Sequence, residues 1–306
     1  MRNQTRPLAP VRSERLLAST WSRTMTELNR GLSSIGNYVV LIAIAAFFVA
    51  PLTWLFVSAF RSNPSVAVEF ADFTTSNFPR VFTGDTLTWI RNSLFIATAA
   101  TTMSVVVAFL AAYPFARFNF PGKTVALFVL VMSMTIPLSA IMLPTFRLAL
   151  FLGLQDTLIG VALILGARQI PLAIWVMKEF IRSVPLELEE AAWVDGAGRL
   201  RTLRKVVFPL TGPGLAVIGM MAFITAWGDF TVTLLLISSP GNVPISLGIA
   251  RKSIEASTSS GLGGEISIDY GLMTAISLIY LAIPIIVFLF AQKYLVKGMV
   301  IGAVKG

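Results

Sequence analysis

Residues 189–214 read EEAAWVDGAGRLRTLRKVVFPLTGPG, a polar, glycine-broken stretch between two apolar runs. Two carboxylates open the stretch, Gly196 and Gly198 interrupt it, and four basic residues follow within 199–205. Such a carboxylate cluster could belong to a catalytic site or to a surface segment. The nature of the surrounding chain decides between these two possibilities.

The local sequence predicts a helix, a glycine break and a second helix. Ser183 can cap the first helix, and Pro185 suits its first turn. Three glutamates favour the positive N-terminal end of that helix: Glu187, Glu189 and Glu190. Gly196 and Gly198 can end it in the left-handed conformation. In a helix over residues 199–207 the leucines and valines fall on one face and the basic residues elsewhere, which predicts an amphipathic helix that ends near Pro209. The simplest interpretation is a solvated linker with an interfacial helix.

The composition of the whole chain indicates a membrane protein. Of 306 residues, 56% are hydrophobic and 13% are charged, whereas soluble proteins carry about 25% charged residues. The net charge is +9, but the basic residues lie at the ends of apolar runs and form no nucleic-acid-binding patch. The chain has no Cys and no His, which removes thiolate chemistry and the commonest metal ligand and general base.

Six apolar runs are long enough to cross a bilayer, which takes about 20 residues per helix. We therefore predict an all-α integral membrane protein with six transmembrane helices. The predicted spans cover residues 38–60, 90–113, 125–146, 158–177, 214–237 and 272–292. The remaining segments are a basic N-terminal arm at 1–35, with an interfacial helix around 16–28, a loop at 181–210, and a tail at 293–306.

The distribution of Lys and Arg predicts the orientation. With the N-terminus inside, the inner segments hold six basic residues in the arm, two in 117–123, six in 178–205 and three in the tail, 17 in total. The outer segments hold six, and Arg168 lies within a span. This asymmetry places both termini and the 181–210 loop on the cytoplasmic side.

Two charged residues fall inside predicted spans, where charge is expensive and indicates function. Arg168 in span four and Asp229 in span five are at similar depth, so we expect them to pair or to share a polar cavity. A purely structural ion pair is an equal alternative. A third possibility is that Asp229 lies near the outer interface.

A sugar-binding site combines aromatic faces with hydrogen-bonding groups. Side chains of both kinds surround the two in-span charges, namely Gln169, Trp175, Trp227 and Thr231. With Arg168 and Asp229 they form the candidate substrate path. For a tryptophan in a span, packing or interfacial anchoring is the commoner role.

Several motifs resemble one family over about residues 36–306. The 189–214 stretch resembles the EAA loop of bacterial ATP-binding-cassette (ABC) importer permeases. AAYPFARFNFPGK (111–123), IPLAIWVMKEFIRSVPLELEEAA (170–192) and the end QKYLVKGMVIGAVKG (292–306) are similar to the carbohydrate, MalG-like branch of the family. The resemblance implies a type I importer fold in the bacterial inner membrane.

In that family the loop's first helix docks in a cleft of an ATPase subunit and passes ATP-driven closure to the spans. The residues that match this element are Glu189, Glu190, Ala191, Ala192, Asp195, Gly196, Gly198 and Pro209. The tail residues Val304, Lys305 and Gly306 would also contact the ATPase. The implied partners are a second homologous permease, two ATPase chains and an extracytoplasmic sugar-binding protein.

The expected function is therefore a non-catalytic permease subunit of an ATP-driven, binding-protein-dependent importer of di- or oligosaccharides. ATP and Mg²⁺ would bind the partner ATPase, and this chain would hold no cofactor or metal. Gly122-Lys123-Thr124 resembles the end of a phosphate-binding loop, but Arg117 replaces its first glycine.

Import of glycerol phosphate or polyols is an alternative within the family. A secondary transporter or channel is less favoured, because it leaves the loop motif unexplained. An intramembrane enzyme is disfavoured because the chain lacks His and Cys.

Overall fold

The computed structural model describes residues 12–62, 64, 70–260 and 269–303. The chain divides into two units, Met1–Phe56 and Val57–Gly306. The described residues are almost entirely helical, with one isolated bridge between Arg61 and Phe73. The expected all-α fold is confirmed.

The helices follow one another with short connections. In chain order they are α1 (Arg12–Ala59), α2 (Asn77–Val81), α3 (Asp85–Arg117), α4 (Lys123–Ser133), α5 (Leu138–Phe151), α6 (Leu158–Ser183), α7 (Leu186–Val194), α8 (Arg199–Thr202), the π-helical η1 (Leu203–Val207), α9 (Phe208–Leu210), α10 (Gly212–Trp227), α11 (Thr231–Leu236), the 3₁₀ turn η2 (Pro240–Asn242), α12 (Ile245–Ser260) and α13 (Tyr270–Ala303).

The first unit consists largely of α1, a single continuous helix with Pro51 inside it. It begins at Arg12, so it includes the stretch 16–28 for which we expected a separate interfacial helix. Its part Gly36–Ala59 is 24 residues long and apolar enough to cross a membrane. Side chains over residues 36–53 are exposed within this chain.

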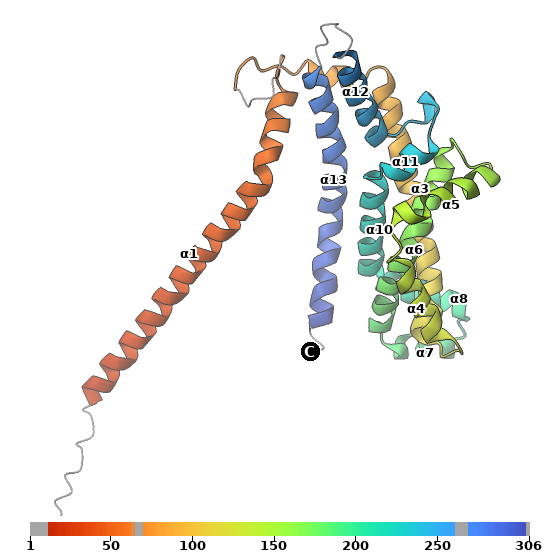
Figure 1. The fold of residues 1–306 in the computed structure, drawn as a ribbon. Coiled ribbons are helices and arrows are strands. Elements are labelled where there is room, and N and C mark those ends of the chain that lie inside the picture. The colour runs from red at the N-terminus through yellow and green to blue at the C-terminus, as the bar shows by residue number, and fades with distance from the viewer. Residues whose placement is uncertain (1–11, 63, 65–69, 261–268, 304–306) are drawn as a thin grey trace, which may run out of the picture. The chain divides into compact units, whose positions relative to one another are not determined.

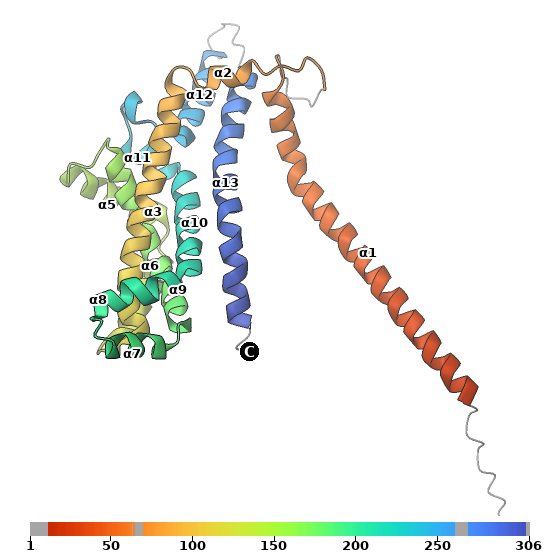
Figure 2. The same ribbon diagram turned by 180° about the vertical axis from the view of Figure 1, so that it is seen from behind.

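The second unit is a bundle in which α3, α6 and α10 lie side by side and α13 lies against α10 (Figures 1 and 2). Small buried residues form a stripe along α3, namely Ala97, Ala100, Ser104, Ala108 and Ala112. This stripe lets α6 approach closely, since a Cβ at Gly166 would lie 3.0 Å from the Ala100 carbonyl oxygen. The Ser104 hydroxyl donates to the Gly166 carbonyl at 2.9 Å across the same seam.

Two pairs of helices in the membrane part of the chain are sharply bent. α4 and α5 meet at a 99° bend, and the segment Arg199–Leu210 meets α10 at 76°. The expected span at 214–237 also ends early, because α10 stops at Trp227 and α11 starts at Thr231. Four described helices are long and apolar enough to cross a membrane, and the two bent pairs raise the number to six.

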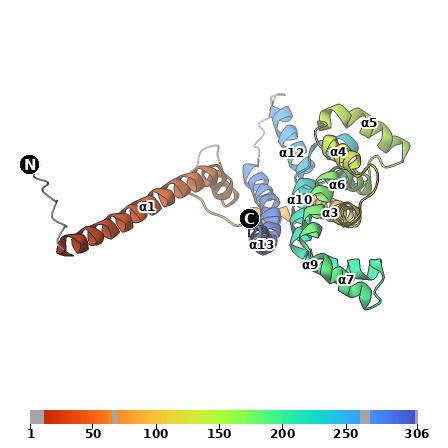
Figure 3. The ribbon, with the colours of Figure 1, turned by 90° about the horizontal axis from the view of Figure 1, so that it is seen from below.

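The bundle has two differently built ends. The segment α7–α9 lies at one end, and α2 and α12 lie at the other (Figures 1 and 2). Viewed along the bundle in Figure 3, α7 and α9 extend to one side of α3, α6 and α10. Two clusters of buried apolar side chains fill the interior. One surrounds Trp227 and Leu236, and the other surrounds Met177, Ile181 and Val207.

Candidate functional site

The α7 helix is defined by its neighbours in the sequence. Pro185 precedes it with extended backbone, and Glu187 and Glu189 lie in its first turn. Ser183 does not cap it, because Ser183 ends α6 and its hydroxyl donates to the Phe180 carbonyl at 2.8 Å. The expected serine cap was therefore wrong: α6 continues through that position.

Gly196 ends α7 as the sequence predicts. Its φ is +80°, its N–H donates to the Trp193 carbonyl at 3.0 Å, and the Ala197 N–H donates to the Ala192 carbonyl at 2.9 Å. These two bonds form a Schellman motif. Gly198 differs from the prediction, since its φ of −68° places it in extended backbone before α8. One glycine therefore ends the first helix and the other precedes the second.

The two adjacent glutamates of α7 have different environments. Glu189 is fully buried: its Oε2 accepts from the Tyr113 hydroxyl and its Oε1 from Arg117 Nε, both at 2.7 Å. Arg117 also donates from Nη2 to the Val184 carbonyl at 2.7 Å. Glu190 is exposed. The sequence assigned both glutamates to partner docking, but only Glu190 is on the surface of this chain.

The other expected docking residues within the described part of the chain are mostly exposed. Ala191, Asp195, Gly196, Gly198 and Pro209 are exposed, and Ala192 is half-buried. Val194 at the end of α7 is 88% exposed. α7 therefore exposes most of its side chains and contacts the bundle through the buried Glu189.

The expected amphipathic helix after the glycines is only partly regular. Leu203 and Val207 are buried, whereas Leu200 is 75% exposed. The π-helical turn η1 accounts for the mismatch, because it adds about one residue per turn and shifts the helical phase. Arg201, Arg204 and Lys205 line a basic groove of about 730 Å³ together with the two glycines and Leu200.

The candidate substrate-path residues differ in burial and in their partners. Trp227 is buried, donates to the Tyr280 carbonyl at 3.1 Å and stacks on the Tyr280 ring at 5.7 Å. Arg168 and Trp175 are exposed on α6, and Thr231 is half-buried at the start of α11. The packing interpretation of Trp227 therefore has direct support.

Asp229 occupies the break between α10 and α11. Its Oδ1 accepts from the backbone N–H groups of Val232 at 2.9 Å and Thr233 at 3.2 Å, which caps α11. Within the described part of the chain, no ion pair of 4.0 Å or less joins Arg168 to Asp229. Asp229 thus has a local capping role that the sequence did not suggest.

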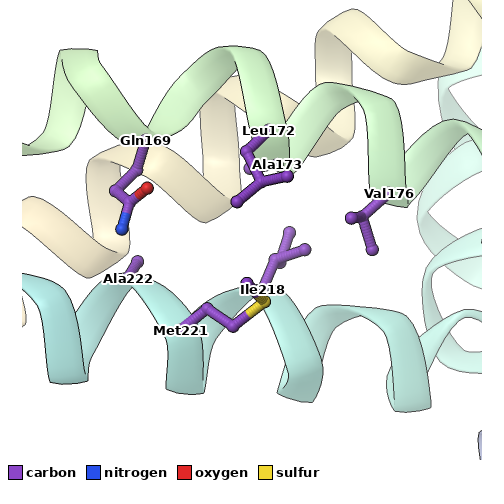
Figure 4. A pocket seen from close by; sticks show the side chains of 7 residues that line it. All are labelled: Gln169, Leu172, Ala173, Val176, Ile218, Met221 and Ala222. Carbon is purple, nitrogen blue, oxygen red and sulfur yellow. The ribbon is translucent and has the colours of Figure 1, made fainter. Parts of the chain in front are cut away.

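A small cleft separates α6 from α10 near Gln169. Figure 4 shows Gln169 of α6 and Ala222 of α10 on its two sides. Its volume is about 10 Å³, which is the size of one water molecule. The expected tail contacts Val304, Lys305 and Gly306 lie outside the described residues. Within the described ranges, no group of three or more acidic residues could hold a metal ion.

The sequence interpretation missed two groups of residues. Tyr113 and Arg117, the partners of Glu189, are one turn apart at the end of α3. Polar residues four apart in the last turn of an apolar helix could have identified them. The second group, at the opposite end of the bundle, links Asp156 to residues 238–242.

Asp156 joins the turn before α6 to the segment after α11. Its carboxylate accepts from the Ser239 hydroxyl and from the backbone N–H groups of Ser238 and Ser239, the latter two at 3.0 Å. The Ser239 hydroxyl bond and these N–H groups hold the pKa of Asp156 below its usual value. Asn242 donates to the Asp156 carbonyl at 2.6 Å, so the two segments are firmly joined.

These residues lie in a region that matches a known protein family. The family model described as "Binding-protein-dependent transport system inner membrane component" matches residues 104–301, which include Tyr113, Arg117 and all of α7–α9. The chain belongs to this family. It is a permease component of an ABC importer and a multi-pass protein of the inner membrane. The expected family is confirmed.

Relatives of this permease are named for the uptake of sugars or of osmoprotective compounds. The maltodextrin transport system permease protein of Bacillus subtilis is 31% identical over 282 residues, which cover 90% of this chain and 98% of the relative. The trehalose/maltose transport system permease protein of Thermococcus litoralis is 32% identical over 287 residues, which cover 91% and 98%. An osmoprotective compounds uptake permease of Synechocystis is 30% identical over 280 residues, with 88% and 91% covered.

A solved structure shares the fold of this permease. A chain of a bacterial ABC transporter that imports the polysaccharide alginate superposes with a TM-score of 0.73 at 24% identity. The match covers 94% of this chain and 99% of that chain. The six-helix importer architecture expected from the sequence is therefore supported, and the side of the membrane that each terminus occupies stays a prediction.

Proposed function

We propose that this chain is a transmembrane subunit of an ATP-driven, binding-protein-dependent importer of di- or oligosaccharides. Its relatives carry the names of maltodextrin and trehalose/maltose permeases. Sugar import is therefore favoured over import of glycerol phosphate or polyols.

The observation that carries the proposal is the two-sided environment of α7. One side is fixed to the bundle by the buried Glu189, while Glu190 and Ala191 on the other side are exposed. A helix of this kind can enter a cleft of a partner and transmit force to the spans. We assign this role to α7, with the tail residues Val304, Lys305 and Gly306 as a second contact.

The remaining parts of the transporter follow from the family. Two ATPase chains would bind ATP and Mg²⁺, and this chain would form no covalent bond. A second homologous permease would complete the pathway, and an extracytoplasmic binding protein would deliver the sugar. Both termini and α7–α9 would lie in the cytoplasm, as the distribution of basic residues predicts.

The substrate path is proposed around Arg168, Gln169 and Trp175 of α6, with Trp227, Asp229 and Thr231 nearby. The exposed position of Arg168 and Trp175 on α6 leaves them free to face a partner permease across a shared cavity. If Arg168 and Asp229 act as a pair, Arg168→Gln combined with Asp229→Asn should impair uptake less than either single change. Additive losses would contradict the pairing.

The decisive experiment is reconstitution. The chain is purified in mild detergent with its genomic neighbours, and co-purification of ATPase chains is measured. A thermal-shift screen of sugars on the binding protein then selects the solute for uptake into proteoliposomes. ATP-dependent uptake supports the proposal. Uptake driven by an ion gradient without ATP would instead support a secondary transporter.

A further inference from the structure

The contact between α3 and α7 is made by a buried polar cluster. Tyr113 and Arg117 lie one turn apart on the last turns of α3 and both reach the carboxylate of Glu189. Glu189 is fully buried, and the Arg117 side chain is 12% exposed. A charge-assisted hydrogen bond in this setting is strong and directional, because little water competes for the two groups.

Arg117 extends the contact to α6. Its Nη2 donates to the carbonyl of Val184, the residue directly after α6 and two before the start of α7. Arg199 at the start of α8 lies over the ring of Phe118 at 4.9 Å, which adds a cation–π contact just beyond α3. The ends of α3 and α6 and the start of α7 are therefore joined around Arg117, and Arg199 at the start of α8 contacts the residue that follows α3.

The segments on both sides of α7 are not α-helical. Pro185 is extended on one side of α7, and Gly196 and Gly198 lie on the other. In contrast, α3 and α6 are packed along the Ser104–Gly166 seam. The cluster thus links α7, which has a proline on one side and two glycines on the other, to a tightly packed helix pair.

We infer that Glu189 is a positioning residue that fixes α7 to α3 and α6, so that a displacement of α7 moves these two helices as one body. Glu190 contacts the ATPase, and Glu189 transmits the resulting displacement. This inference rests on the proposed function. It gives the two adjacent glutamates different roles, docking for Glu190 and transmission for Glu189.

The first test measures coupling in the complete transporter. Glu189→Gln keeps the side-chain size but removes the charge opposite Arg117, and Glu187→Gln is the matched change at an exposed glutamate of the same helix. We expect the Glu189→Gln complex to retain its ATPase chains and to hydrolyse ATP. Sugar imported per ATP should fall at least about fivefold, the lower end of usual coupling factors. The Glu187→Gln complex should import as much sugar per ATP as the parent.

A second test measures the position of α7 directly. Because the chain has no cysteine, spin labels can be attached through Val194→Cys on α7 and Leu110→Cys on α3, both at exposed positions. We expect a narrow distance distribution in the full-length parent and in Glu187→Gln, and a broad one in Glu189→Gln. Tyr113→Phe removes one hydrogen bond of the cluster, so its distance distribution should be broader than the parent's but narrower than that of Glu189→Gln.

Parental transport per ATP together with a parental distance distribution in Glu189→Gln would overturn the inference. If Glu189→Gln does not assemble, Tyr113→Phe is judged by the same two measurements. Failure of the proposed function has a different signature: the parental complex itself would show no ATP-dependent uptake.

Discussion

The two ends of the bundle both use a carboxylate to join segments far apart in the sequence, but they do so differently. At one end, Glu189 is fully buried and binds the side chains of Tyr113 and Arg117. At the other, Asp156 is partly exposed and binds backbone N–H groups and a serine hydroxyl. The first arrangement depends on a matching cation, whereas the second depends on the local backbone path. The α7 end should therefore be the more sensitive to substitution.

The largest effect is expected from Glu190→Lys, which reverses the charge of the exposed glutamate on α7. The bundle should stay folded and the binding protein should still deliver sugar, because Glu190 supports neither. ATP-dependent uptake should fall at least about tenfold, within the usual range of coupling free energies. Uptake and ATP hydrolysis in proteoliposomes measure the effect, and normal uptake would count against docking through α7.

Arg117→Met tests the buried cluster itself. It leaves Glu189 buried without its cation, so we expect the free energy of unfolding to fall by about 3 kcal/mol. Adding Glu189→Met removes the orphaned charge, and the double variant should be more stable than the single one. Thermal unfolding in detergent measures both. The single variant Glu189→Met completes the comparison. If the double variant loses as much free energy of unfolding as the two single variants lose together, the two residues act independently.

Gly196→Ala tests the end of α7. Because φ is +80° at this position, an added Cβ should destabilise the turn by about 1–2 kcal/mol. Gly198→Ala is the control, since its φ is −68° and no atom lies within 4 Å of the added Cβ. Equal melting temperatures for the two variants would contradict the assignment of the Schellman motif.

Asp156→Asn should have the smallest effect. Asn tolerates the positive φ of 55° at this position, and the loss should not exceed about 1 kcal/mol because the bonds are partly exposed. The pKa of Asp156 is lowered in the folded chain, so its charged form stabilises the fold above the unfolded pKa of about 4. This contribution is lost as the pH falls through the folded pKa. The difference in melting temperature between the parent and Asp156→Asn should thus be larger at pH 7 than at low pH.

The sequence predicts the helical class and Gly196 well because each has a direct physical cause. Long apolar runs have few other solutions in a membrane, and a positive φ favours glycine. The breaks at 134–137 and 228–230 were not placed in advance because apolar sequence lies on both sides of each. The polar residue at the second break, Asp229, was taken for an in-span charge, although it caps the next helix.

Adjacent glutamates show why the site was only partly predictable. Consecutive residues on a helix point about 100° apart, so Glu189 and Glu190 must face different surroundings. Which of them faces the bundle depends on how α7 is rotated against α3. The apolar residues of α7 do not indicate this rotation, because they do not mark a buried face. Leu186, Leu188 and Trp193 are all exposed. Only the three-dimensional contact with Tyr113 and Arg117 resolves it.

The π-helical turn η1 bears on how this segment responds to a change in length. Such a turn holds about one residue more than an α-helical turn, so it behaves like a single-residue insertion between α8 and α9. Deleting one residue within the turn, such as Arg204, would convert η1 into an ordinary α-helical turn and leave α8 and α9 in their present orientation. The same deletion in a regular helix would rotate everything beyond it by about 100°. The segment between α8 and α9 should therefore tolerate the loss of one residue better than α3 or α6 would.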